Sequence, residues 1–154
     1  MDTEGDVAPE TVAAVRDRYE TVGSTAQVVV KEVAKAMEMD AEEYDRRVTG
    51  DVVATARDAL FASTLRVHVG TRGEYENWLT DHPDYDVQEV GSENVDNVVW
   101  HPAPAAGTVV AATFHEERRA AVDTLRRQAF GRVYRPLVSA ESDQDAGADA
   151  DREL

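Results

Sequence analysis

Apolar residues recur every three or four positions in the first third of the chain, which predicts amphipathic helices. The first such stripe consists of Val12, Val15, Tyr19 and Val22. Pro9 precedes the stripe and suits the first position of a helix, because its fixed φ is already helical. Gly23 follows the stripe, and Ser24 and Gln27 have the spacing of a capping box. We therefore expect one helix to end at Gly23 and a second to begin at Ser24.

Helical spacing continues beyond this point. The apolar face of the second predicted helix consists of Val29, Val30, Val33 and Met37. Asp40 and Glu43 then have capping spacing again and predict a short helix that reaches Val48. Residues 49–50 interrupt the pattern, after which it resumes with Val52, Val53, Ala56 and Leu60. The region from about 9 to 63 is thus predicted to be helical.

The period of the pattern changes to two from residue 64 onward, which predicts a half-buried strand. The apolar positions of this strand are Leu65, Val67 and Val69. Thr71 and Glu74 then fit a capping box that begins a short helix. Three further strands are expected, at 86–90, 95–101 and 108–114. Turn residues separate them, so we expect them to pair in sequence order as an antiparallel meander. The last of the three is apolar on both faces, as a central strand would be.

A long helix is predicted near the C-terminus, from about 116 to 135. Its apolar sector contains Ala121, Val122, Leu125, Ala129 and Val133. Pro136 should end this helix, because proline supplies no backbone N–H. Residues 139–154 are acidic and nearly free of apolar side chains. Such a segment cannot bury enough surface to offset its loss of entropy, so we predict a disordered acidic tail.

These elements predict one α+β domain over residues 1–138. It has a helical subregion at about 9–63 and a strand-rich subregion at about 64–138. In this fold class the helical N-terminal part packs with a small, mainly antiparallel four-stranded sheet and the long C-terminal helix. The length of 154 residues suits a single domain.

The charge balance adds an expectation about the environment. The chain has 31 acidic residues against 16 basic ones, for a formal net charge of −15, and only Lys31 and Lys35 are lysines. So many carboxylates repel one another in dilute buffer, whereas molar salt shortens the screening length to about 3 Å. We therefore expect a protein of a halophilic cell that needs high salt to fold. An ordinary acidic protein is the alternative.

Several absences bear on the compartment. The chain has no cysteine, its first ten residues have no basic side chain, and it has no apolar run long enough for a membrane span. We expect a cytoplasmic protein with no membrane contact. No cofactor motif is present, and we expect no cofactor.

The histidines offer one candidate for metal chemistry. His68, His82, His101 and His115 all follow residue 60, and Asp81, Asp84 and Asp86 lie in the same region. Imidazole and carboxylate groups both bind divalent metals, although their spacing here matches no known metal motif. The simpler interpretation is solvated or hydrogen-bonded histidines without a metal. No nucleophile motif is present.

The final helix offers a second candidate, because it is rich in arginine. We identify Arg126, Arg127 and Arg132 as candidate binding residues for a phosphate or an acidic partner protein. Local pairing is the alternative, since Arg119 and Arg127 each lie four residues from Asp123. A net negative chain argues against nucleic acid as the partner. That argument weakens in a cell where every protein surface is acidic.

Two segments carry a resemblance to a known family. They are Thr25-Ala26-Gln27-Val28-Val29-Val30-Lys31-Glu32-Val33-Ala34-Lys35-Ala36-Met37-Glu38 and Val48-Thr49-Gly50-Asp51-Val52-Val53-Ala54-Thr55-Ala56-Arg57-Asp58-Ala59-Leu60-Phe61-Ala62. The chain resembles a family of short, acidic, uncharacterised proteins from halophilic archaea, over most of its length except the tail. This resemblance implies the halophilic origin and transfers no catalytic residue.

By elimination, we expect a non-enzymatic protein-binding or regulatory module, acting on a protein partner or on a second copy of itself. Two alternatives stay open. One is a nucleic-acid or phosphate binder that uses the arginine-bearing helix. The other is a metal-dependent enzyme that uses the histidines and aspartates after residue 60.

Overall fold

The computed structural model describes residues 1–139 of the 154, so the predicted tail lies outside the described residues except for residue 139. Five strands form one mixed sheet in the order β1-β2-β4-β5-β3. They are β1 (Asp2–Glu4), β2 (Val67–Thr71), β4 (Asn97–Ala103), β5 (Thr108–Phe114) and β3 (Asp86–Val90). The α+β fold class is confirmed, but the sheet has five strands and not four. The short β1 has too few residues for a periodic pattern, so the sequence did not reveal it.

The expected meander is wrong, because β3 does not pair with β4. It pairs in parallel with β5, with Val87 opposite Val109, while β4 lies antiparallel to β5 on its other side. The burial of the strands explains this order. Every residue of β3 is exposed, which suits an edge, whereas six of the seven residues of β4 are buried, which suits the centre.

The first helix, α1 (Val12–Ala36), is continuous over 25 residues, so the predicted break at Gly23 and the new start at Ser24 are wrong. The helix begins after Thr11, whose Oγ1 accepts a hydrogen bond from Ala14 N. Gly23 has a packing role instead. A Cβ at this position would lie 2.9 Å from Cζ of Arg57, so glycine lets that guanidinium lie against α1.

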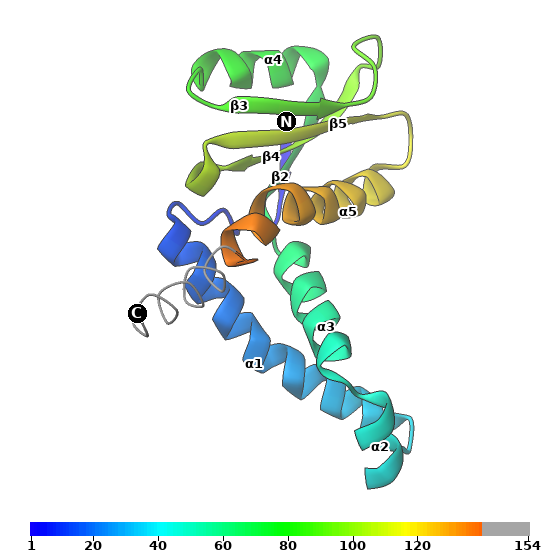
Figure 1. The fold of residues 1–154 in the computed structure, drawn as a ribbon. Helices are drawn as coiled ribbons and strands as arrows, with labels where there is room; N and C mark the ends of the chain where they lie inside the picture. The colour runs from blue at the N-terminus through cyan, green and yellow to red at the C-terminus, as the bar shows by residue number, and fades with distance from the viewer. Residues whose placement is uncertain (140–154) are drawn as a thin grey trace, which may run out of the picture.

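The helices α2 (Ala41–Arg47) and α3 (Gly50–Ser63) follow. Asp40 caps α2, as predicted, and Thr49, where the sequence pattern only showed an interruption, caps α3 by accepting a hydrogen bond from Val52 N. Figure 1 shows α1 and α3 running side by side away from the sheet, with α2 at the far end. We call residues 24–53, the outer part of this hairpin, the helical arm. No helix within residues 1–139 combines the length and apolar character needed to cross a membrane.

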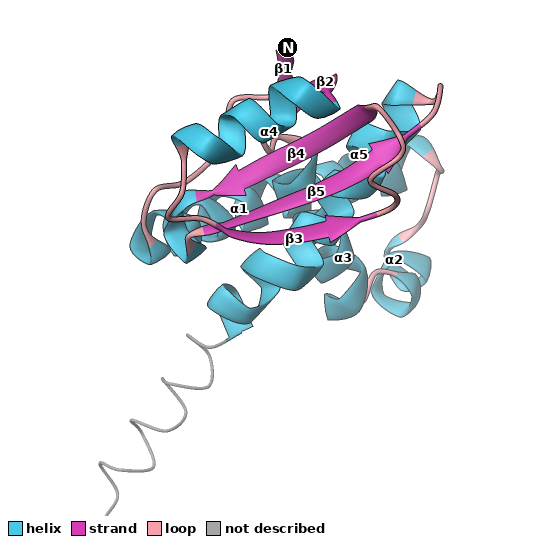
Figure 2. Ribbon diagram, turned by 90° about the horizontal axis from the view of Figure 1, so that it is seen from above, coloured by secondary structure: helices cyan, strands magenta, loops and turns pink. Residues whose placement is uncertain are grey.

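The helix α4 (Arg72–Asp81) begins with the predicted capping box of Thr71 and Glu74. It covers one face of the sheet, and α5 (Arg118–Ala129) lies on the other face (Figure 2). The apolar core is divided accordingly. Tyr75 and Trp100 pack together on the α4 side, while Val99 and Val110 face the larger core formed with α1, α3 and α5.

The final helix continues past Pro136, so the prediction that this proline ends it is wrong. A π-helical turn at Phe130–Tyr134 follows α5, and helical structure resumes as far as residue 139. Arg135 N donates to the carbonyl of Phe130, five residues back. The π turn is wider than a regular α-helical turn, and this extra width accommodates the ring of Pro136.

Candidate functional site

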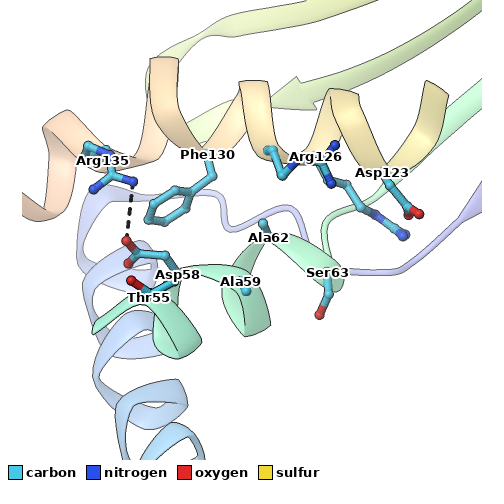
Figure 3. A pocket seen from close by; sticks show the side chains of 10 residues that line it. Thr55, Asp58, Ala59, Ala62, Ser63, Asp123, Arg126, Phe130 and Arg135 are labelled. Carbon is cyan, nitrogen blue, oxygen red and sulfur yellow. Dashed lines mark ion pairs between the residues drawn. The ribbon is translucent and has the colours of Figure 1, made fainter. Parts of the chain in front are cut away.

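A cavity of about 510 Å³ lies between α3 and the helical segment formed by α5 and its π turn (Figure 3). Its apolar walls come from Ala59 and Ala62 on α3 and from Phe130 opposite them. Five charged side chains also line it: Asp58, Asp123, Arg126, Arg127 and Arg135. Apolar walls with a few polar groups are typical of small-molecule sites, and the volume falls in their usual range.

Arg126 is the most unusual of the charged residues, because only 9% of it is exposed. Its Nε donates to the carbonyl of Leu65 at 3.0 Å. Gly5 lies against the same guanidinium, since a Cβ there would lie 2.7 Å from Nη2. Within residues 1–139 no carboxylate forms an ion pair with Arg126. A buried cation without a counter-charge is costly, so this guanidinium is suited to receive an anion.

The carboxylates of the cavity, in contrast, already have partners. Asp58 accepts a hydrogen bond from the hydroxyl of Tyr19 at 2.8 Å and pairs with Arg135 at 3.3 Å. Burial and the bond to Asp58 both raise the pKa of Tyr19 above its usual value. Asp123 pairs with Arg119 at 3.6 Å, as predicted. These carboxylates therefore leave Arg126 uncompensated.

The predicted pairing of Arg127 with Asp123 is absent. Nη2 of Arg127 donates instead to Oγ1 of Thr124 at 3.3 Å. Arg126 and Arg127 thus bring two guanidinium groups without carboxylate partners in residues 1–139 to one cavity. Such a local excess of positive charge stands out in a chain whose formal net charge is −15.

Arg132, the third candidate from the sequence, does not line the cavity and is exposed in the π turn. The structure therefore brings two of the three candidate arginines together and separates the third. Sequence reasoning missed Asp58, Phe130 and Arg135. Asp58 and Arg135 come from distant parts of the chain, and no local spacing connects them.

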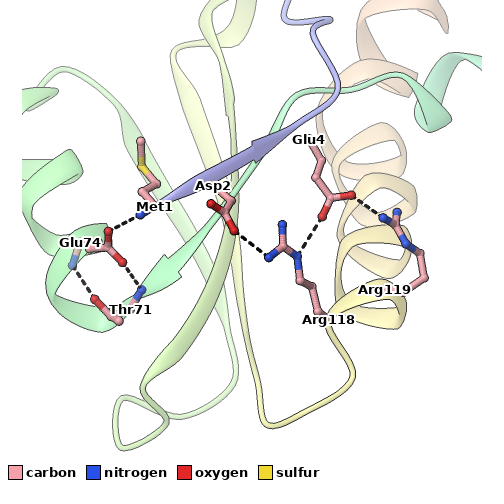
Figure 4. Close-up of polar contacts among 7 residues, drawn as sticks. All are labelled: Met1, Asp2, Glu4, Thr71, Glu74, Arg118 and Arg119. Atoms are coloured by element: carbon pink, nitrogen blue, oxygen red, sulfur yellow. Dashed lines mark hydrogen bonds and ion pairs between the residues drawn. The ribbon is translucent and has the colours of Figure 1, made fainter.

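The remaining arginines at the start of α5 bind the N-terminal strand (Figure 4). Arg118 pairs with Asp2 at 2.8 Å and with Glu4 at 3.0 Å, and Arg119 also binds Glu4. Burial alone would raise the pKa of Glu4, but the hydrogen bonds from Arg119 and Arg118 outweigh it and lower that pKa. These contacts fix β1 to α5, which also holds Gly5 near Arg126.

The histidines and aspartates considered for a metal do not gather. His68 Nδ1 lies 2.9 Å from Thr3 Oγ1, and the ring of His82 stacks on Trp78 with its Nδ1 2.7 Å from the Trp78 carbonyl. His101 is fully buried between Arg66 and Tyr134. Over residues 1–139 no three His, Asp or Glu side chains are placed to hold a metal ion.

The chain matches a known protein family. The profile of a family described as a family of unknown function (DUF5809) matches residues 6–135, which is most of the chain. No curated protein and no solved structure gives a significant match.

Proposed function

The chain belongs to the DUF5809 family of unknown function, which carries no activity over to it, and we propose from the geometry that it is a non-enzymatic binding module for an anionic ligand. The anion binds in the cavity between α3 and α5. One observation carries this proposal: the guanidinium of Arg126 is 9% exposed, lines the cavity and has no carboxylate partner in residues 1–139.

The chemistry of the site favours binding over catalysis. A guanidinium group is a permanent cation in proteins, so Arg126 and Arg127 are suited to attract and orient an anion and not to transfer protons. Asp58 is engaged by Tyr19 and Arg135. A bound anion would neutralise Arg126 in its buried position and stabilise the contact of α5 with α3. Ligand binding that stabilises a helix contact is a simple basis for a regulatory role.

Thermal unfolding in the presence of inorganic phosphate tests the proposal. A ligand that binds only the folded state raises Tm, and the rise grows with ligand concentration. We expect phosphate to raise Tm more than chloride does at equal ionic strength. Arg127→Gln should remove most of that difference. Arg132→Gln is the matched control, because it deletes the same charge outside the cavity, and it should retain the difference.

If phosphate raises the Tm of Arg127→Gln as much as that of the unmodified protein, the proposal is wrong. Arg127 is exposed, so its replacement should not prevent folding. A nucleic-acid ligand is a separate outcome. It would bind with a steep decrease of affinity as salt rises, because several phosphate contacts release counterions. Titration with a single-stranded oligonucleotide at two salt concentrations distinguishes that case.

The high-salt cytosol is a further part of the proposal. It is supported by the net charge of −15 and by the presence of only two lysines. Molar salt screens carboxylate repulsion at distances beyond about 3 Å. Melting in dilute buffer and in molar KCl tests this, and equal midpoints would refute the salt requirement.

A second candidate function, self-association through the helical arm, rests on an apolar stripe of α1. The stripe is buried at Val15, Val22 and Ala26, and it continues on the same side of the helix as Val29, Val33 and Met37. Val33 is 52% exposed and Met37 61%. The exposed part thus extends a face that already packs inside the molecule, and a second copy of this arm offers a matching surface.

The charge of the apolar part of the first helix, not of the whole arm, fits a second copy. Residues 24–37 contain Lys31 and Lys35 against Glu32 alone, a formal charge of +1, so two of these helices approach without the repulsion expected between strongly anionic surfaces. Light scattering in molar KCl gives the mass directly. We expect a dimer that Val33→Glu converts to a monomer, and a monomeric unmodified protein would exclude this candidate.

A further inference from the structure

We infer that the ligand of the α3–α5 cavity is an organic anion with one anionic head, carboxylate or phosphate, and an apolar body. This inference rests on the proposed anion-binding function and makes it more specific. The two parts of the ligand correspond to two parts of the cavity: the guanidinium groups of Arg126 and Arg127, and the apolar walls formed by α3 and Phe130.

The apolar part of the cavity is held rigidly. Phe130 packs against Phe61 with ring centroids 5.5 Å apart and against Tyr19 at 6.3 Å. The Arg135 guanidinium also lies over this ring, 5.1 Å from its centroid. Figure 3 shows Phe130 facing α3, with Ala59 and Ala62 on the opposite wall. The small alanine side chains leave space beside the ring, which an apolar body would fill.

The charges at the two ends of the cavity limit the ligand to a small anionic head. Asp58 lies at the Arg135 end of the cavity and Asp123 at the Arg126 end (Figure 3). Each of these carboxylates already pairs with an arginine, so negative charge that extends beyond Arg126 and Arg127 meets carboxylates and paired arginines only, and the carboxylates repel it. A polyphosphate or a nucleic-acid backbone would place phosphates against them. One head that is bound by the two guanidinium groups avoids this repulsion, and the arginine fork suits carboxylate and phosphate alike.

The apolar body also supplies the selectivity that the charges lack. In molar KCl, chloride is abundant and long-range attraction is screened, so a site that recognised charge alone would fill with chloride. Burial of apolar surface is not weakened in this way, because its contribution grows with the apolar area that is removed from water. Contact with Phe130 and the α3 alanines would thus distinguish the ligand from simple salt ions.

Isothermal titration in molar KCl with five probes tests the inference. The probes are 4-phenylbutyrate, phenyl phosphate, acetate, inorganic phosphate and the neutral 4-phenylbutanol. We expect one or both phenyl-bearing anions to bind at least tenfold more tightly than acetate and phosphate, and the alcohol at least tenfold more weakly than 4-phenylbutyrate. The two phenyl-bearing anions together show which head the arginines prefer.

Two variants locate the binding. Ala59→Leu fills the space beside the apolar wall. It should lower the affinity for the phenyl-bearing anions tenfold or more and leave the affinity for inorganic phosphate unchanged. Arg127→Gln should lower the affinity for every anion, whereas Arg132→Gln, which lies outside the cavity, should change none of these affinities. Ala59 is exposed, so the larger side chain should not prevent folding.

The possible failures are distinguishable. If acetate and phosphate bind as tightly as the phenyl-bearing anions, the apolar body has no role and this inference is wrong, while the proposed anion-binding function stands. If the alcohol binds as tightly as 4-phenylbutyrate, the anionic head is not recognised and both are wrong. If none of the five probes binds, both are again wrong.

Discussion

The hydroxyl of Tyr134 donates a hydrogen bond to Nε2 of His101 across 2.7 Å, and both side chains are fully buried. The direction of this bond follows from the other ring nitrogen. Nδ1 of His101 lies 2.5 Å from the carbonyl of Arg66, which can only accept. Nδ1 therefore carries the proton, and Nε2 is the acceptor. The pair connects the centre of the sheet to the π turn of the final helix.

Replacing Tyr134 with phenylalanine should destabilise the fold by about 1–3 kcal/mol, because Nε2 of His101 is left buried without a donor. Chemical denaturation at neutral pH measures the change. Tyr75→Phe is the matched control. The Tyr75 hydroxyl is also buried but makes no hydrogen bond of regular geometry within residues 1–139. The Glu89 carboxylate near it is bound by Arg72, so removal of the hydroxyl leaves no buried partner unsatisfied. Equal losses for the two variants would contradict the role of the His101 bond.

Stability should fall as the pH is lowered from 6.5 towards 4, and His101 should be one cause. Burial lowers the pKa of this imidazole from 6.5 to about 4. Between these values the unfolded chain binds a proton that the folded chain does not, so acidification favours unfolding. The slope from this residue is about 1.4 kcal/mol per pH unit at most. Denaturation at a series of pH values measures it.

His101→Gln provides the control for this pH dependence, because glutamine does not titrate. The difference in stability between the two proteins should shrink as the pH falls. The pKa values of Glu4 and Glu74 are also lowered in the folded protein, so protonation of these carboxylates at low pH reduces stability as well. Both proteins share this loss of stability. Parallel stability curves for the two proteins between pH 6.5 and 4 would show that His101 does not titrate as described.

Gly5→Ala should destabilise the protein by about 2 kcal/mol or more. Gly5 has φ +77°, and a Cβ there would lie 2.6 Å from the carbonyl oxygen of Leu65 and 2.7 Å from Arg126 Nη2. The substitution therefore adds backbone strain and a steric clash at the buried guanidinium. Gly131→Ala is the control, since a Cβ there meets nothing within 4 Å and helical alanine stabilises by up to about 1 kcal/mol. In thermal melts, Gly5→Ala should lower Tm and Gly131→Ala should raise it.

Thr71→Ala should cost about 1 kcal/mol, because it removes the capping hydrogen bond from Glu74 N to Thr71 Oγ1. Thr80→Ala in the same helix is the control. The Thr80 hydroxyl only donates to a carbonyl within the helix and caps nothing, so its loss should change stability little. Urea denaturation of both variants measures the difference, and a loss for Thr80→Ala as large as that for Thr71→Ala would argue against the cap.

Local chemistry determined the parts of the fold that the sequence predicted correctly. These parts depend on interactions over a few residues, so they can be predicted without the structure. Examples are the caps at Asp40 and Thr71 and the alternation of Val67 and Val69. Gly23 misled the prediction, because a glycine that usually ends a helix here makes room for Arg57. Such a tertiary reason leaves no local signal.

Pairing and burial between distant segments account for the remaining errors. The turn after β3 has the composition of a hairpin, yet the exposed side chains of β3 suit an edge of the sheet, and β3 takes the edge beside β5. At the site, the arginine-rich helix was recognisable. The burial of Arg126 was not, because it depends on Gly5 and Leu65, which lie far from it in the sequence. The burial of His101 likewise has no local signal that sets it apart from the other three histidines.

The position of the helical arm in the chain has a consequence for how this family can vary. The strands β1 and β2 are antiparallel neighbours, with Glu4 opposite Val67, so residues 5–66 form in topological terms the loop of one β-hairpin. The helix α2 lies at the end of the arm that is far from the sheet (Figure 1). Helical turns added or removed near α2 therefore leave the pairing of β1 with β2 in place. The length of the helical arm can thus change in evolution while the α3–α5 cavity stays the same.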